Sequence, residues 1–154
     1  MNARLSLSAE RERKSRTMEL LIVTGMSGAG KSQAANVLED IGFYCVDNIP
    51  PAIIPSFVEL SARSGDLLNK MAIVTDMRGG VLFYEIEDVL TNLKNNDTEY
   101  KILFLDAADD VLIRRYKENR RKHPLADSEN MSVSAAVKKE REMLKTIRYM
   151  SDYI

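Results

Sequence analysis

Short apolar runs alternate with longer amphipathic stretches along most of the chain. The runs occupy residues 20–24, 43–46, 72–75 and 102–105, and the last three each end directly before an aspartate. A continuous apolar run of this length is typical of a parallel strand that is covered on both faces. The pattern therefore predicts four parallel strands, the first of which leads directly into a glycine-rich segment.

The intervals between the runs carry apolar residues at helical spacing. We expect helices over residues 31–42, 53–64, 82–94, 108–122 and 134–149, with His123-Pro124 ending the fourth of them. Regular alternation of strands and helices is typical of a doubly wound parallel sheet with right-handed crossovers and helices on both faces. The predicted fold is therefore α/β.

The two ends of the sequence differ from this regular part. Residues 1–17 are polar and mixed in charge, and we expect them to form a poorly ordered extension, with Met18 as an alternative start. Tyr153-Ile154 look like the first residues of a fifth strand. We therefore expect a single domain over 18–154 that is a truncated product or an isolated part of a longer protein.

Composition places the chain among ordinary soluble globular proteins. Hydrophobic residues make up 45% and charged residues 29% of the sequence, and the net charge is −1. No apolar run approaches the roughly 20 residues that cross a bilayer. The single cysteine, Cys45, excludes an intramolecular disulfide and is expected to be a small buried residue. These features favour a cytoplasmic protein without a membrane partner.

The glycine-rich segment has the form G-x-x-x-x-G-K-[ST] and reads Gly25-Met26-Ser27-Gly28-Ala29-Gly30-Lys31-Ser32. Glycines let the backbone wrap around phosphate oxygens, and the following helix directs the positive end of its dipole at the same anion. Lys31 would reach the β and γ phosphates, and the Ser32 hydroxyl would bind Mg²⁺. The alternative is an ordinary glycine turn. The segment is therefore a P-loop, which makes the predicted fold a P-loop NTPase, and it predicts that these eight residues bind a nucleoside triphosphate with Mg²⁺.

Three aspartates follow predicted strands, namely Asp47, Asp76 and Asp106. The carboxyl ends of parallel strands converge at the edge of a sheet where ligands bind. We favour Asp76 as the residue that holds the water shell of the metal, and Asp47 as a contact to Mg²⁺ or to a phosphate acceptor. For each aspartate the alternative is a helix cap or a turn, which we favour for Asp106. Arg78 could bind a phosphate, pair with a carboxylate or be solvated.

Basic residues crowd the fourth predicted helix, and these are Arg114, Arg115, Lys117, Arg120, Arg121 and Lys122. The helix could act as a lid whose Arg114 and Arg115 meet the γ-phosphate. It could instead bind RNA phosphates, because Arg114, Lys117 and Arg121 fall on one helical face. The third interpretation is a solvated helix. His123, the only histidine, is expected to be a cap or turn residue rather than a catalytic base.

Several motifs together resemble one known family. They are the loop at 25–32, Val-Asp-Asn-Ile-Pro at 46–50, Asp-Met-Arg at 76–78, Phe-Leu-Asp-Ala at 104–107 and Arg-Arg-Tyr-Lys-Glu-Asn-Arg-Arg-Lys-His-Pro-Leu at 114–125. In this combination they resemble the RapZ/YvcJ family of bacterial P-loop nucleotide-binding proteins, also called RNase adapter proteins. The resemblance covers about residues 18–154.

The resemblance implies binding of both ATP and GTP with slow hydrolysis, and it assigns the adenine nucleotide to the loop at 25–32. It also implies a second nucleotide-associated segment at Asp76-Met77-Arg78-Gly79, where Gly79 replaces the usual Asn. Lys122 is an insertion between the arginine pair and His123. Family members carry a C-terminal domain that is absent from this sequence, and in some bacteria that domain binds small regulatory RNA and a ribonuclease.

We therefore expect a weak ATPase/GTPase that acts as a regulatory switch. Lys31 would stabilise charge on the phosphates, and Asp47 or Asp76 would orient the attacking water. A small-molecule kinase and an RNA-binding adapter module are the alternatives. An RNA or protein partner would act through the missing C-terminal domain, and homo-oligomerisation stays open.

Overall fold

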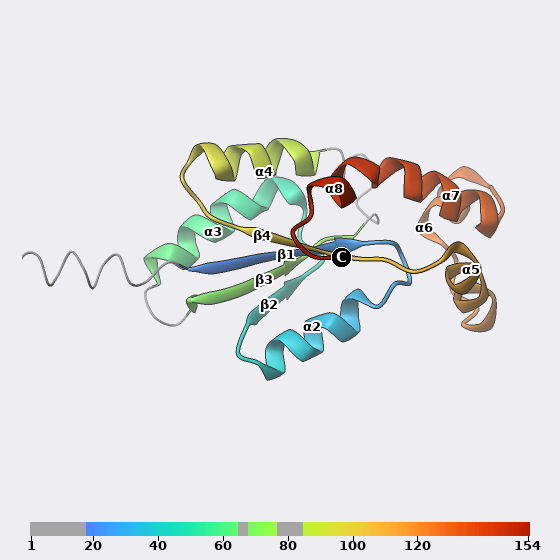
Figure 1. The fold of residues 1–154 in the computed structure, drawn as a ribbon, viewed down its shortest axis with the longest axis horizontal. Helices are drawn as coiled ribbons and strands as arrows, with labels where there is room; N and C mark the ends of the chain where they lie inside the picture. The colour runs from blue at the N-terminus through green and yellow to red at the C-terminus, as the bar shows by residue number, and fades with distance from the viewer. Residues whose placement is uncertain (1–17, 65–67, 77–84) are drawn as a thin grey trace, which may run out of the picture.

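A computed structural model describes residues 18–64, 68–76 and 85–154 of the chain. Its centre is a four-stranded parallel sheet with the strand order β2-β3-β1-β4 (Figure 1). The strands are β1 (Glu19–Gly25), β2 (Tyr44–Asp47), β3 (Lys70–Val74) and β4 (Lys101–Leu105). The four predicted strands are therefore confirmed, each within two residues of its expected bounds.

Helices cover both faces of this sheet, as expected. In chain order they are α2 (Lys31–Asp40), the 3₁₀ turn η1 (Pro51–Ile53), α3 (Ile54–Arg63), α4 (Ile86–Asn95), α5 (Asp109–Glu118), α6 (Pro124–Glu129), α7 (Val133–Met143) and α8 (Lys145–Met150). One face carries α2, whereas α3, α4 and α8 lie on the other (Figure 1). The remaining helices, α5, α6 and α7, gather beyond the carboxyl ends of the strands.

Alternate residues of β1, β3 and β4 enter two different cores. Leu20 and Ile22 of β1 belong to the larger core, which they share with residues of α3, α4, α7 and α8. Val23 belongs to the smaller core, together with Ala35 and Leu38 of α2. Successive side chains of a strand point to opposite faces, so a strand covered on both sides must be apolar throughout. This arrangement explains the continuous apolar runs in the sequence.

The fourth predicted helix is shorter than expected, and this corrects two predictions. It ends at Glu118, and Arg120 has a φ of 50°, in the left-handed region that ends helices. The chain therefore leaves the helix axis before Arg121, so His123-Pro124 does not end it. Pro124 instead begins a separate short helix, α6, with His123 as its N-cap. Proline suits this first helical position because its missing N–H has no intrahelical partner there.

Three other predicted helices also differ in detail. The segment expected as one helix over 134–149 is divided at the buried Leu144 into α7 and α8. The helix expected over 53–64 is preceded by the 3₁₀ turn η1, where Pro51 takes the first position. The helix expected over 82–94 is present as α4 from Ile86 onward, and residues 77–84 lie outside the described part of the chain.

The last residues of the chain lie beside β4. Tyr153 forms a parallel bridge with Leu103, and the Phe104 N–H donates to the Tyr153 carbonyl at 2.8 Å. The predicted start of a fifth strand is therefore confirmed at this edge of the sheet. Residues 1–17, expected as an extension, lie outside the described part of the chain. None of the helices seen over 18–64, 68–76 and 85–154 is long and apolar enough to span a membrane.

Candidate phosphate-binding site

The predicted P-loop connects the end of β1 to the start of α2 and depends on its glycines. Gly25, Gly28 and Gly30 have φ values of 138°, 84° and 106°, a region that side chains with a Cβ rarely adopt. A Cβ on Gly25 would lie only 2.1 Å from the carbonyl oxygen of Leu105 in β4. Position 25 therefore requires glycine, because the backbone there has a positive φ and β4 lies too close for a Cβ.

Three N–H groups of the loop are used within the protein. The Met26 N–H donates to the Leu105 carbonyl at 3.0 Å, and the Ala29 N–H donates to the Met26 carbonyl at 3.1 Å. The Ser27 N–H donates to the carboxylate of Glu140 at 3.0 Å. Among the described residues, the N–H groups of Gly28 and Gly30 have no protein acceptor. The loop thus holds two unused donors directly before a helix.

The N-terminus of α2 adds to this positive potential. Gly30 is its N-cap and has no side chain to cap the helix, and the first turn contains no acidic residue. The first N–H groups of a helix lack intrahelical acceptors and carry the positive end of its dipole. The helix N-terminus and the loop donors therefore point positive groups at one region, as the sequence motif leads one to expect of an anion site.

Lys31 and Asp76, two residues singled out from the sequence, lie close together. The Lys31 side chain is only 7% exposed, and its ammonium donates to the carbonyl oxygens of Gly25 and Met26, each at 2.9 Å. The same nitrogen lies 3.8 Å from Oδ1 of Asp76. Asp76 follows β3, which pairs directly with β1, so its carboxylate lies beside the loop.

The other residues predicted for the metal and for catalysis take different positions. Ser32, the second residue of α2, is exposed, and its hydroxyl has no hydrogen-bond partner among the described residues. Asp47 ends β2 opposite Val74 and is exposed. Because β3 separates β2 from β1, Asp47 lies one strand farther from the loop than Asp76. Met77, Arg78 and Gly79, predicted to bind nucleotide, lie outside the described residues.

Asp106 has a structural role, as favoured from the sequence, but with arginine partners instead of a helix cap. Its carboxylate accepts from Arg141 at 2.8 Å and from Arg148 at 3.0 Å. Burial raises the pKa of Asp106, but the hydrogen bonds from Arg141 and Arg148 outweigh it, and the pKa lies below its ordinary value. Asp106 thus ties the end of β4 to α7 and α8.

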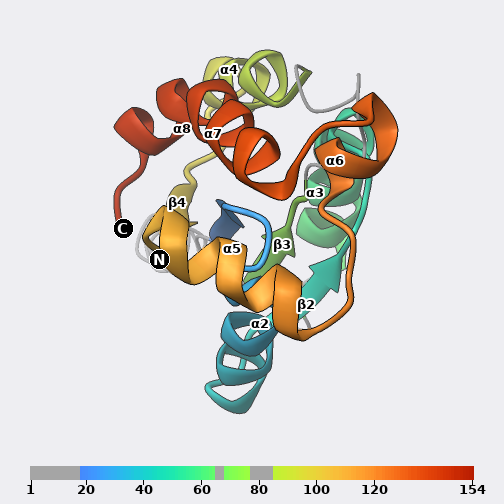
Figure 2. The same cartoon turned by 90° about the vertical axis from the view of Figure 1, so that its right-hand side faces the viewer.

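The helix α5, for which a lid is one of three interpretations of the sequence, lies across the loop. Nη1 of Arg115 donates to the carbonyl oxygen of Gly28 at 2.8 Å. A Cβ on Gly28 would lie 3.2 Å from the ring of Tyr116, so this ring contacts the loop as well. Figure 2 shows α5 in front of the segment that joins β1 to α2. Of the two predicted lid arginines, Arg115 contacts the loop directly.

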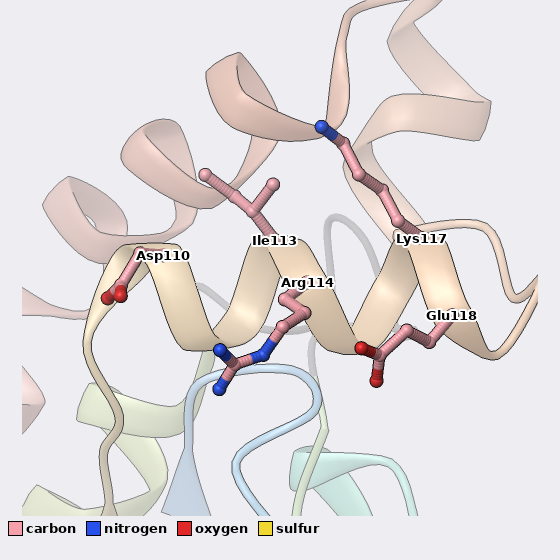
Figure 3. Close-up of a pocket in the computed structure, with 5 residues that line it drawn as sticks. All are labelled: Asp110, Ile113, Arg114, Lys117 and Glu118. Atoms are coloured by element: carbon pink, nitrogen blue, oxygen red, sulfur yellow. The ribbon is translucent and has the colours of Figure 1, made fainter.

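The exposed side of α5 also carries a shallow hollow of about 540 Å³. Its lining residues are Asp110, Ile113, Arg114, Lys117 and Glu118 (Figure 3). All of them belong to α5, and none is a residue of the loop at 25–32. In Figure 3 the guanidinium of Arg114 lies on the side of α5 that faces the ribbon of the loop, whereas Ile113 and Lys117 point the other way.

The predicted RNA-binding face is corrected by the bounds of α5. Arg114 and Lys117 belong to the helix, but Arg121 lies beyond its end and cannot share a helical face with them. Lys122 also lies outside α5 and forms an ion pair with Asp127 of α6, with 2.9 Å between Nζ and Oδ1. The basic cluster of the sequence is therefore divided between a helix and the turn that follows it.

Sequence reasoning missed one residue of this region, Glu140 of α7. It is fully buried, and its carboxylate accepts from Ser27 of the loop and contacts Nε2 of His123 at 2.9 Å. A signal was present in the sequence, because Glu140 shares the apolar helical face formed by Ala136, Val137 and Leu144. A glutamate at a core position needs buried partners.

His123 has the capping role expected for it and a further contact. Its Nδ1 accepts from the N–H of Leu125 at 3.2 Å, as an N-cap of α6. The ring is fully buried, and its centroid lies 5.0 Å from that of Tyr116. His123 therefore connects α6, α5 and Glu140 behind the loop.

Known proteins are similar to this chain in sequence and in fold. Among curated relatives, a "Nucleotide-binding protein" of Caldicellulosiruptor bescii is 49% identical over 137 residues, which are 89% of this chain and 47% of the relative. A protein of the same name from Finegoldia magna is 50% identical, again over 89% of this chain and 47% of the relative. The chain therefore spans about half the length of the curated relatives it matches.

Solved structures show the fold. Shikimate kinase from Bacteroides thetaiotaomicron has a TM-score of 0.52 at 19% identity, and the match covers 88% of this chain and 84% of that chain. Shikimate kinase from Acinetobacter baumannii, in complex with shikimate, also has a TM-score of 0.52, at 15% identity and over 92% and 84% of the two chains. At such low identity these matches support the predicted P-loop NTPase fold and no particular activity.

Residues 18–154 match the family described as the RapZ-like N-terminal domain, over nearly the whole chain. The match includes the loop, both arginines of α5 and the buried Glu140. It agrees with the resemblance drawn from the sequence motifs. This chain belongs to the RapZ-like family through its N-terminal domain.

Proposed function

We propose that this domain binds a nucleoside triphosphate, ATP or GTP, with its phosphates in the loop at 25–32. The observation that carries the proposal is the pair of N–H groups of Gly28 and Gly30, which find no acceptor in the described part of the chain and precede the uncapped N-terminus of α2. Relatives at about half identity bear the name nucleotide-binding protein, which supports the same ligand class.

Lys31 is the cation that would meet the phosphates. Its ammonium is held by two carbonyl oxygens of its own loop, Gly25 and Met26, at the base of the anion site. Phosphate oxygens carry more negative charge than carbonyl oxygens and accept stronger hydrogen bonds from an ammonium. A bound triphosphate would therefore draw Lys31 toward its β and γ groups.

Two residues at the loop carry hard oxygen donors of the kind that bind Mg²⁺. The Ser32 hydroxyl and the Asp76 carboxylate are both of the oxygen type that Mg²⁺ prefers, and Asp76 already lies beside Lys31. The donor set therefore fits this ion, with Ser32 as a direct ligand and Asp76 holding its water shell. Bound Mg²⁺ would neutralise charge that develops on the phosphates.

We propose slow hydrolysis, suited to a regulatory switch. The only histidine, His123, is buried with Nδ1 bound to Leu125 and Nε2 bound to Glu140, so neither nitrogen is available as a general base. Water would instead be oriented by the carboxylate of Asp47 or Asp76. Phosphoryl transfer depends on positioning and electrostatics, and Lys31 and Arg115 supply the positive charge.

A regulatory output would need a part of the protein outside this nucleotide-binding domain. Because the chain spans 47% of the length of its relatives, we propose that a regulatory output to RNA or to a protein partner uses the additional part that they contain. A cytoplasmic location, where ATP and GTP are both available, fits this role.

Equilibrium binding of ATP and GTP, with and without Mg²⁺, tests the proposal. Wild type is compared with Lys31→Ala, and Lys94→Ala in α4 serves as an exposed control of equal charge change. We expect Lys31→Ala to weaken binding by at least about tenfold, since it removes a charged donor. Equal affinities of wild type and Lys31→Ala, or no binding by wild type, would contradict the proposal.

A further inference from the structure

The backbone N–H and the hydroxyl of Ser27 both donate to the carboxylate of Glu140, which lies on α7. The Ser27 N–H lies 3.0 Å from Oε1 and 3.2 Å from Oε2, and the Ser27 hydroxyl donates to Oε1 at 2.6 Å. Glu140 and Ser27 are both buried. A hydrogen bond from a donor to an ionised acceptor is stronger than one between neutral groups. Ser27 is therefore held firmly from the side of α7.

His123 completes the set of donors to this carboxylate. Its Nδ1 accepts the N–H of Leu125 and so carries no proton, which places the ring proton on Nε2. Nε2 then donates to Oε2 of Glu140 at 2.9 Å. The carboxylate thus receives hydrogen bonds from the loop and from the N-cap of α6, as a buried charge requires.

The next residue of α7 attaches the same helix to the start of α5. Arg141 donates to Asp109 at 2.7 Å and to the carbonyl oxygen of Ala107 at 2.7 Å. Glu140 and Arg141 together therefore connect the phosphate loop with the helix that lies across it. A shift of α7 would change the position of both.

We propose that Glu140 is a positioning residue of the nucleotide site, acting through Ser27 and oriented by His123. By accepting the Ser27 N–H, it sets the backbone conformation in which the next N–H, that of Gly28, has no acceptor among the residues that the structure describes. The inference rests on the proposed function, because the ligand of those donors is the triphosphate.

The sign of the effect separates positioning from simple electrostatics. A buried negative charge beside the loop repels a triphosphate, so removing that charge alone would strengthen binding. Removing the group that orients Ser27 would weaken binding. A purely structural Glu140 would lower thermal stability and leave the affinity of the folded protein unchanged.

The test measures Mg·ATP affinity by calorimetry for wild type, Glu140→Gln and the control Glu142→Gln. Glu142 lies on the same helix and is exposed, so Glu142→Gln makes the same change in charge at a residue that does not contact the loop. Glutamine has a single acceptor oxygen, which cannot accept from all three groups that donate to the two oxygens of the Glu140 carboxylate. We expect Glu140→Gln to weaken binding by about tenfold or more, the loss of one hydrogen bond to a charged group. Unchanged or stronger binding would overturn the proposal.

A second variant keeps the test decisive if Glu140→Gln does not fold. Ser27→Ala removes only the hydroxyl donor, and we expect weaker Mg·ATP binding from it as well. In a folded double variant the two effects should not add, because both act through one contact. Wild-type affinity in Ser27→Ala would overturn the proposal.

A measurement on the nucleotide-free protein separates this inference from the proposed function. In ¹⁵N NMR, His123 gives the only histidine signals, and we expect the tautomer with its proton on Nε2. We also expect slow hydrogen exchange of the Ser27 N–H, and fast exchange in Glu140→Gln. Slow exchange without any nucleotide binding would refute the proposed function alone. Equally fast exchange in wild type would refute the role of Glu140 alone.

Discussion

The ammonium of Lys31 lies 3.8 Å from a carboxylate oxygen of Asp76, at the junction of the loop after β1 and the end of β3. The two residues are 45 positions apart in the chain, but β1 and β3 are adjacent strands, which brings their carboxyl ends together. The pair places one positive and one negative group beside the two unused N–H groups of the loop. In the proposed function, Lys31 would meet the phosphates and Asp76 would face the hydrated cation.

Asp76→Asn should weaken nucleotide binding only when Mg²⁺ is present. The carboxylate is proposed to hold the water shell of the ion, so its loss should reduce Mg·ATP affinity by about tenfold. Without Mg²⁺ the affinity should be equal or higher, because a negative charge beside the phosphates is removed. Calorimetry with Mg²⁺ and with EDTA measures the difference, and the exposed Asp97→Asn is the control. An equal loss under both conditions would show that Asp76 does not serve the metal.

Arg115→Ala should slow hydrolysis with little effect on stability. Arg115 is exposed and makes one hydrogen bond to the carbonyl of Gly28, so we expect the free energy of unfolding to change by less than about 1 kcal/mol. If the guanidinium meets the γ-phosphate, the rate of phosphate release should fall by at least about tenfold. Lys117→Ala, on the same helix, is the control. A wild-type rate in Arg115→Ala would exclude the lid role of this residue.

Gly25→Ala and Gly42→Ala should differ strongly in stability, although both glycines have positive φ values of 138° and 95°. A Cβ on Gly42 would meet no atom within 4 Å, so the substitution should cost only the conformational strain, about 1–2 kcal/mol. A Cβ on Gly25 would overlap the Leu105 carbonyl, which should raise the cost to about 3 kcal/mol or more. Urea unfolding compares the two, and similar midpoints would contradict the close approach of the loop to β4.

Asp106 should make the domain less stable in acid. Its folded-state pKa lies below the ordinary value of 3.8, so its contribution to stability is complete above about pH 4 and is lost as the pH falls through the lower, folded-state pKa. The free energy of unfolding of wild type should therefore decrease between pH 5 and pH 3 more than that of Asp106→Asn. Urea titrations at pH 5 and at pH 3 measure this decrease, and Asp40→Asn, at an exposed aspartate, is the control. Parallel decreases in wild type and Asp106→Asn would exclude the contribution.

Local sequence was sufficient to predict the strands, the loop and the family. Strand periodicity and the glycine pattern are properties of neighbouring residues, and the burial of alternate residues in two cores agrees with them. Asp76 could be placed beside Lys31 because parallel strands end at one edge of a sheet. The bounds of α5 were predicted less well, since its end depends on the left-handed backbone of Arg120, which no glycine marks in the sequence.

Tertiary structure alone decided which distant side chains support the loop. Ser27 and Glu140 are 113 residues apart, and Gly28 and Arg115 are 87 apart. No pattern of neighbouring residues encodes such contacts, because they arise only when α5 and α7 pack beyond the carboxyl ends of the strands. The sequence by itself predicted an anion site at 25–32. The packing of the C-terminal helices determined how its backbone is held, because a buried carboxylate must find its donors wherever the fold places them.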